Sequence, residues 1–213
     1  MKMFKQFQQL TWKVVDLVNS PQKTQRITRN AIVSRVILKE FIETAMMMDR
    51  KGFFAGSFGE ISLRTNGGKF LITPRDMSIC RINEETIRIA AIEKESDTAN
   101  ENLPLHTQWH REIYRNSNAN AVVLCQPPFA TVLANKMQKL AQDLLVDAKK
   151  LLDSTDFVIP EDVALKNKLD EEYTLFIQSI GILVWGKSLD DLLNRIEILE
   201  RLSAISLKGK YSQ

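Results

Sequence analysis

Two short runs near the middle of the chain, Gly59-Glu-Ile-Ser-Leu-Arg64 and Phe70-Leu-Ile-Thr-Pro74, decide the fold. The first alternates polar and apolar residues, which is typical of a strand with one buried face, and the second is a short apolar strand that a proline ends. A third alternating run follows at Thr86 to Ile92. Three strands this close together leave no room for crossover helices, so the pattern predicts antiparallel pairing.

Helical patterns stand on both sides of these strands. Apolar residues recur at spacings of three and four from Thr28 to Arg50, and Ser188-Leu-Asp-Asp provides a capping signal for a last helix over Leu189 to Leu207. The other predicted elements are strands at Glu60 to Arg64, Lys69 to Thr73, Ala119 to Leu124 and Thr174 to Trp185, a helix near Thr107 to Arg115, and one or two helices within residues 129 to 152. Helices therefore flank a mainly antiparallel sheet.

The chain has enough apolar side chain for one compact domain, because 44% of its 213 residues are hydrophobic. Residues 1–27 begin with an apolar stripe that includes Phe4, Phe7 and Leu10, which predicts an amphipathic helical extension. We expect this extension to precede a single domain over residues 28–213.

Basic residues are concentrated near the N-terminus. Residues 1–39 hold eight Lys or Arg against one Asp, whereas the formal net charge of the whole chain is only +3. No basic stripe interleaved with aromatic residues accompanies this charge, so we do not expect nucleic-acid binding. A solvated helix face or an acidic neighbouring subunit also explains the charge. A further hypothesis is an interaction protein whose basic N-terminal helix does the work, which deletion of residues 1–27 would test.

Cysteine usage and hydropathy predict a soluble cytoplasmic protein. Cys80 and Cys125 are too few for a disulfide framework, and no secretory signal pattern follows the basic start. No stretch approaches the roughly 20 apolar residues needed to cross a bilayer, so we expect no membrane association.

Four fragments of the chain together resemble the class II aldolase/adducin family over about residues 30 to 207. Besides the two strands quoted above, they are His110-Arg-Glu-Ile-Tyr114 with Asn120-Ala-Val-Val123 and Pro127-Pro128, and Ile180-Gly-Ile-Leu-Val-Trp-Gly-Lys-Ser-Leu189 with the helix through Ile196-Glu-Ile-Leu-Glu-Arg-Leu202. The resemblance implies an α/β fold, a three-layer α/β/α sandwich with a central, mostly antiparallel sheet.

The resemblance also implies where a catalytic zinc would bind. Catalytic members, which include L-fuculose-1-phosphate aldolases, hold zinc with three His and use a nearby Glu as a base. Position by position, the His residues fall on Leu124, Gln126 and Ile180, and the Glu falls on His106, or on Thr107 if Pro104 is matched to the family Pro. Because zinc needs about three Cys, His, Asp or Glu ligands, we expect no zinc and no working zinc aldolase.

A ligand- or partner-binding pseudo-enzyme with a remodelled cleft is the resulting hypothesis. Glu60 falls on an Asn of the phosphate site, where its carboxylate would repel a phosphate, although Arg75 could compensate in part. With Arg64, Thr73 and Gln126, these residues are the predicted cleft, and His106 is the candidate catalytic residue. Ion pairs at strand edges are the simpler role for the charged ones.

The alternative hypothesis is a metal-dependent aldehyde-lyase, a carbon–carbon lyase, acting on a small sugar-phosphate-like substrate. His106 and His110 are four residues apart and would share one helix face, and Cys125 could complete a relocated zinc site. The intervening Thr-Gln-Trp lacks the acid of a His-Glu-x-x-His enzyme. A nucleophilic role for Cys125 would need a base and a depressed thiol pKa.

The resemblance further implies assembly, because domains of this family build their clefts between subunits. Met46 to Met48, the N-terminal stripe and the C-terminal helix offer more apolar surface than one small domain covers. We therefore predict a homo-oligomer, with a tetramer favoured, that binds a small-molecule ligand or a protein partner.

Overall fold

The computed structural model describes residues 34–94, 102–140, 148, 155–163, 165 and 173–208. The chain divides into two units at Lys39 and Glu40. Of the first unit the structure describes residues 34–39, which enter the helix α3 (Arg35–Arg50). The predicted extension at residues 1–27 lies outside the described residues. The fold that follows is that of the second unit.

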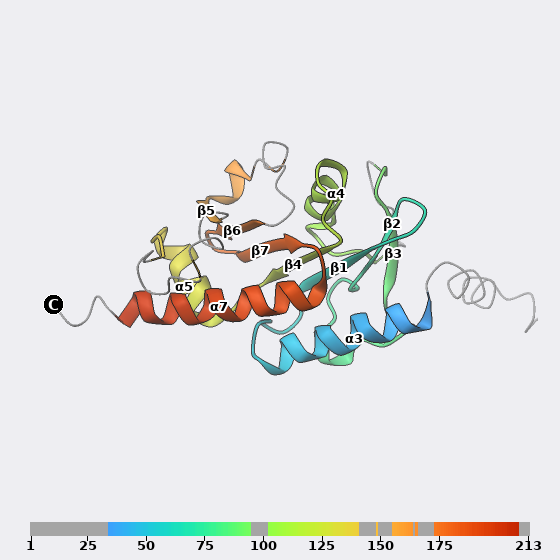
Figure 1. The fold of residues 1–213 in the computed structure, drawn as a ribbon, viewed down its shortest axis with the longest axis horizontal. Helices are drawn as coiled ribbons and strands as arrows, with labels where there is room; N and C mark the ends of the chain where they lie inside the picture. Colours follow the sequence, from blue (N-terminus) through green and yellow to red (C-terminus); the bar gives the residue numbers. More distant parts are fainter. Residues whose placement is uncertain are drawn as a thin grey trace, which may run out of the picture. The chain divides into compact units, whose positions relative to one another are not determined.

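A seven-stranded sheet forms the centre of this unit, with the strand order β3-β2-β1-β4-β7-β6-β5 (Figure 1). Its strands are β1 (Glu60–Thr65), β2 (Lys69–Ile72), β3 (Arg88–Ala91), β4 (Ala121–Cys125), β5 (Thr155–Val158), β6 (Tyr173–Ile177) and β7 (Gly181–Gly186). All neighbours pair antiparallel except β5 and β6, which are parallel. The prediction of a mostly antiparallel sheet is confirmed.

Helices cover both faces of the sheet, as the three-layer prediction requires. The helix α4 (Thr107–Asn116) lies on one face, and α7 (Leu189–Lys208) lies on the other with α5 (Pro128–Lys136) beside it (Figure 1). α7 packs on β4 and β7, and α5 packs on α7, β6 and β7. Short 3-10 turns occur at Ile79–Arg81 and Pro160–Asp162.

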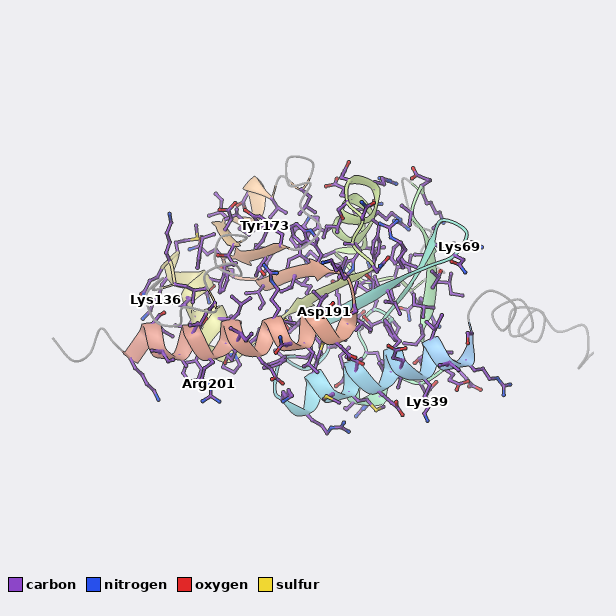
Figure 2. The ribbon with its side chains drawn as sticks, in the orientation of Figure 1. Lys39, Lys69, Lys136, Tyr173, Asp191 and Arg201 are labelled. Carbon is purple, nitrogen blue, oxygen red and sulfur yellow. The ribbon has the colours of Figure 1, made fainter. Side chains whose placement is uncertain are left out.

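The long helix α7 buries an apolar stripe at spacings of three and four residues. Leu192, Ile196, Leu199 and Leu202 are buried, while Arg201 is exposed and points away from the sheet (Figure 2). Each fully buried Leu or Ile contributes about 1.5–3 kcal/mol, so this stripe is a main anchor of the helix. No helix among the described residues is long and apolar enough to span a membrane.

The strand β4 lies at the middle of the sheet and is buried on both faces, with all five residues inaccessible. Val122 and Leu124 join Leu183 and Trp185 of β7 in the hydrophobic cluster beneath α4. In the antiparallel register, Glu60 lies opposite Leu124, and Ser62 lies opposite Val122. Polar residues of β1 are therefore held inside an apolar layer, next to α4.

The predicted single strand from Thr174 to Trp185 is wrong, because the structure forms a hairpin of β6 and β7. The turn contains Ser179 with a φ of 62°, and its backbone N–H donates to Asn135 Oδ1 at 2.7 Å. Gly181 follows with a φ of 129°, and a Cβ there would lie 2.3 Å from the carbonyl oxygen of Cys125. The turn interrupts the apolar run with Gln178 and Ser179 before Gly181, and the sequence prediction carried one strand across these residues.

Two further elements differ from the prediction. β5 was not predicted, and it pairs parallel with β6 at the sheet edge. The helix α5 ends at Lys136, where Met137 adopts the left-handed conformation with a φ of 48°. The rest of the helical prediction for residues 129 to 152 lies largely outside the described residues.

Candidate functional site

Polar side chains of β1 and α4 meet in a ladder, which we define as Glu60, Ser62 and Arg64 facing His106, His110 and Tyr114. Alternate residues of a strand are about 6.6–6.8 Å apart along its axis, and residues four apart on a helix rise by about 6 Å. The two spacings along the strand and the helix are therefore nearly equal, so each of the three strand residues contacts the helix residue beside it.

Glu60 is the centre of the ladder and is only 5% exposed. Its Oε1 accepts hydrogen bonds from Nδ1 of His106 at 2.7 Å and from the backbone N–H of His106 at 3.2 Å. Its Oε2 lies 3.4 Å from Nε2 of His110, within ion-pair distance but without hydrogen-bond alignment. The carboxylate is thus held between two imidazoles.

The charge state of Glu60 follows from these contacts. Burial by itself raises the pKa of a carboxyl group, but the close contacts and charges of His106 and His110 outweigh burial and lower the pKa of Glu60 to about 2. Glu60 is therefore ionised at neutral pH, and it can act only as an acceptor.

His110 continues the ladder into the core. It is fully buried, and its Nδ1 lies 2.6 Å from Oγ of Ser62, which in turn lies 2.7 Å from the hydroxyl of Tyr114. Burial raises the pKa of the Tyr114 hydroxyl above its usual range, so the phenol stays protonated. Although Glu60, His110 and Ser62 follow the order of a carboxylate–imidazole–hydroxyl triad, the Ser62 hydroxyl is inaccessible and serves as a structural link.

Arg64 closes the ladder at its other end. Its guanidinium lies over the Tyr114 ring at 4.8 Å, and it donates to the backbone oxygens of Ala119, Tyr114 and Ser117 at 2.7–3.0 Å. These bonds fix the connection between α4 and β4. The predicted cleft residue Arg64 is thus engaged with backbone within the fold.

Thr73 and Arg75 also have backbone contacts in this region. Thr73 is fully buried, and its hydroxyl accepts a hydrogen bond from the backbone N–H of Ile61 at 3.2 Å. Arg75 is exposed, and its backbone N–H donates to the carbonyl oxygen of Asn102 at 3.1 Å. Of these two predicted cleft residues, only Arg75 leaves its side chain in solvent.

Gln126 follows β4 at the same end of the sheet as Glu60. Its amide oxygen accepts from the backbone N–H of Ala55 at 3.4 Å, and its amide nitrogen donates to the carbonyl oxygen of Phe58 at 3.4 Å. Both ends of the Gln126 amide therefore have backbone partners. His106 bonds to Glu60.

The two aliphatic residues singled out from the sequence lie in one apolar cluster. Leu124 is 1% exposed, and Ile180 is partly buried against the same cluster. Cys125, next to Leu124, is fully buried on β4, where burial, with a contribution from the charge of Glu200, raises the pKa of its thiol. The thiol is therefore protonated at neutral pH.

The structure brings together two of the three side chains of the alternative metal site. His106 and His110 both contact Glu60. Cys125 lies on β4, opposite Ile182 of β7. Within the part of the chain that the structure describes, no three His, Cys, Asp or Glu side chains form a group able to hold a metal ion. A relocated site at His106, His110 and Cys125 stays a prediction.

Sequence reasoning missed three contributors to this region. Trp109 packs its ring against His106 with centroids 4.4 Å apart, and Ser62 links His110 to Tyr114. Glu200 of α7 accepts from the backbone N–H groups of Phe129 and Ala130 at 3.0 and 2.9 Å, capping α5. The alternation of β1 and the four-residue spacing of α4 could have predicted the position of Ser62. The capping of α5 by Glu200 could not be predicted, because Glu200 and the residues that it caps come from separate helices with no local sequence pattern.

The site thus combines an ionised, buried carboxylate with one buried and one accessible imidazole. His106 is 28% exposed, whereas His110 is not exposed. An imidazole oriented by a carboxylate can accept or deliver a proton at its free nitrogen. Of the predicted site residues, His106 alone has this arrangement at the surface of the ladder.

Solved structures with the same fold are found among sugar-phosphate aldolases. An L-fuculose-1-phosphate aldolase from Thermus thermophilus matches with a TM-score of 0.70 and 22% identity over 81% of this chain and 95% of that chain. A sugar-phosphate aldolase from Thermotoga maritima matches with a TM-score of 0.67 and 19% identity, covering 84% of this chain and 97% of that one. At these identities the likeness concerns the fold.

A third similar structure is the N-terminal class II aldolase domain of a conserved protein from Thermoplasma acidophilum. Its TM-score is 0.57 and its identity 11%, over 78% of this chain and 92% of that chain. A search of curated protein sequences gives no match. The sequence model of the "Class II Aldolase and Adducin N-terminal domain" matches residues 39–207. The chain therefore belongs to the class II aldolase and adducin N-terminal domain family.

Proposed function

We propose that this protein is a member of its family that has lost zinc-dependent aldol chemistry and acts by binding a small ligand or a partner in a remodelled cleft. The observation that carries this proposal is the state of Leu124, Gln126 and Ile180, the positions at which the family resemblance in the sequence implies the zinc-binding histidines. Two are hydrocarbon side chains packed in one cluster, and the third has backbone partners for its amide.

These three residues do not fit a zinc ion. Zinc in catalytic sites takes about three ligands from His, Cys, Asp and Glu, and neither an aliphatic side chain nor a primary amide belongs to that set. Leu124 is 1% exposed and opposite Leu183 in the sheet, so the position is also dry. Without a metal ion, the electrophilic stabilisation that zinc provides to a carbonyl substrate is missing.

The charge of Glu60 supports a change of ligand as well. The family resemblance puts Glu60 at an Asn position of the phosphate site, and its carboxylate is ionised. At about 4 Å and an intermediate effective dielectric, repulsion between a carboxylate and one phosphate charge costs several kcal/mol. A sugar phosphate, the substrate class of the similar solved structures, is therefore a poor ligand for this cleft.

Aldolase activity is the first test of the proposal. Wild-type protein supplied with zinc should not cleave L-fuculose 1-phosphate, as measured by coupled detection of the products. Turnover that requires zinc and disappears in His106→Ala would overturn the proposal and favour the alternative, a metal-dependent carbon–carbon lyase with ligands from His106, His110 and Cys125.

Introducing histidines tests whether Leu124, Gln126 and Ile180 correspond to the zinc-ligand positions of the family. The variant Leu124→His/Gln126→His/Ile180→His should bind zinc more tightly than wild type in a competition titration with a chelating dye. Gln126→His alone supplies a single ligand and serves as the control. A correctly folded triple variant with no gain over this control would show that these positions do not converge on one metal site.

A further inference from the structure

The accessible imidazole of His106 is fixed in place from two directions. Its Nδ1 lies 2.7 Å from Glu60 Oε1, and the backbone N–H of His106 donates to the same oxygen at 3.2 Å. One face of the ring packs against Trp109, with ring centroids 4.4 Å apart and planes inclined by 30°. A free surface histidine has none of these restraints, so the ring presents one defined edge to solvent.

The hydrogen on His106 is fixed by the chemistry of its partner. Glu60 is ionised and its oxygens accept hydrogen bonds, so Nδ1 of His106 must carry the hydrogen. In the neutral ring, Nε2 then holds a lone pair. Within the described residues this atom has no hydrogen-bond partner, and the side chain is 28% exposed. An oriented acceptor therefore faces outward beside a buried carboxylate.

We propose that Nε2 of His106 is the hydrogen-bond and proton acceptor of this site, and that Glu60 is its positioning residue. The ligand must present a hydrogen on oxygen or nitrogen to Nε2. In a proton transfer, that ligand bond breaks, the N–H bond forms at Nε2, the electron pair stays on the ligand, and the imidazolium keeps its Nδ1–H on Glu60. The inference rests on the proposed function, because the cleft must bind the ligand that supplies this hydrogen.

His110 strengthens the assignment by its contrast with His106. Both imidazoles contact Glu60, but His110 is fully buried and its Nδ1 is used by Ser62. The titratable groups facing His106 are therefore Glu60 and, across the same carboxylate, His110. Since the chain has only these 2 His residues, each can be observed without interference from others.

The direct test is the tautomer of His106 in the wild-type full chain. Nitrogen-15 NMR of the imidazoles, with the pH raised until the His106 ring is neutral, should show a protonated Nδ1 and an unprotonated Nε2 for His106. The assignment comes from His106→Gln. In Glu60→Gln, a neutral amide can donate or accept, so the ring should populate both tautomers. A protonated Nε2 in the wild type would overturn the inference without needing any variant.

Chemical reactivity gives an independent measurement. Diethyl pyrocarbonate acylates an exposed imidazole nitrogen that carries a lone pair, so it should modify one ring per wild-type chain and none in His106→Gln. Glu60→Gln should lower the rate by about twofold or more, as the reactive tautomer becomes a fraction of the whole. Failure of His106 to react, or equal reaction of both rings, would overturn the inference.

Inorganic phosphate distinguishes an acceptor from an anion site. A lone pair beside an ionised carboxylate should not bind the phosphate dianion, so millimolar phosphate should leave the His106 nitrogen shifts unmoved at the same pH. Saturable shifts would identify His106 as an anion-binding donor and end this proposal. If His106 has the other tautomer and the protein is zinc-free and inactive, this inference fails and the proposed function is unaffected. If the protein shows zinc-dependent turnover, the proposed function itself is wrong.

Discussion

At the scale of single residues, Glu60 holds an ionised carboxylate inside the fold, between β1 and the start of α4. A buried carboxylate without partners is strongly unfavourable, and His106 and His110 remove that penalty from opposite oxygens. The same contacts that keep Glu60 ionised also orient His106. The chemistry proposed for His106 and the stability of the ladder therefore depend on one carboxylate.

Glu60 should make stability depend on pH below the ordinary range of a carboxyl group. Its folded-state pKa of about 2 lies below the usual 4.5, so its contribution is full above about pH 4.5 and is lost as the pH falls toward 2. Denaturant unfolding across this window should show a steeper loss for wild type than for Glu60→Gln. Glu84→Gln, at an exposed position, is the control and should follow wild type. Parallel curves for wild type and Glu60→Gln would contradict the prediction.

Ser62 should be needed as a link between two buried polar groups. Ser62→Ala removes a partner of both the His110 ring and the Tyr114 hydroxyl, and it leaves that hydroxyl with a 3.5 Å hydrogen bond to the Asn120 oxygen. The change is expected to cost about 1–3 kcal/mol of unfolding free energy. Adding Tyr114→Phe removes one of the two groups that Ser62→Ala deprives of a partner. The double variant should therefore lose less unfolding free energy than the sum of the two single losses. Strict additivity in urea unfolding would show that the two hydroxyls are not coupled.

At the scale of elements, the sequence revealed strands more readily than the turns between them. Alternation identified β1 and β3, and the spacing of α7 gave its buried stripe, because each element has one apolar face. The β6–β7 hairpin was missed because both strands are buried and the prediction did not treat Gln178, Ser179 and Gly181 as a turn between them. β5 was missed as a short edge strand that is only partly buried.

The candidate site was predictable in composition and only partly in its contacts. The sequence placed Glu60 and His106 in the same cleft, and their spacings on a strand and a helix already allowed the ladder. The distribution of hydrogen bonds was not predictable, since it depends on how α4 seats on β1. Gln126 illustrates this, because its partners belong to the loop before β1.

Gly181 should be sensitive to the smallest substitution. Its φ of 129° and the 2.3 Å approach of an added Cβ to the Cys125 oxygen both oppose Gly181→Ala. Gly67→Ala is the matched control, since Gly67 has a φ of 75° with open space around it. The control should lose about 1–2 kcal/mol from its backbone conformation, and Gly181→Ala should lose more in thermal unfolding. Equal losses would mean that the hairpin does not need this close approach.

At the scale of the whole molecule, the predicted apolar surface at Met46 to Met48 is divided between core and solvent, whereas the N-terminal stripe lies outside the described residues. Met48 is fully buried and Met47 is 41% exposed, so the three methionines do not form one exposed patch. Phe58 and Leu105, which precede Glu60 and His106 in the chain, are 71% and 74% exposed. Large exposed apolar side chains beside a candidate site are typical of a contact surface.

We propose that a second copy of the chain covers Phe58 and Leu105. Light scattering at micromolar concentration should give a closed homo-oligomer, with a tetramer favoured, and Phe58→Asp/Leu105→Asp should shift it to smaller species. Ile159→Asp, at another exposed apolar position, is the control and should keep the wild-type mass. A monomeric wild type would contradict the assembly prediction.

The zinc content of protein purified without chelator is the decisive measurement for this chain. We expect far less than one zinc per chain and no change of thermal stability on chelation, because a metal bound only to the folded state would add stability that chelation removes. One zinc per chain that disappears in His106→Ala or His110→Ala would mean that this protein has kept a metal site.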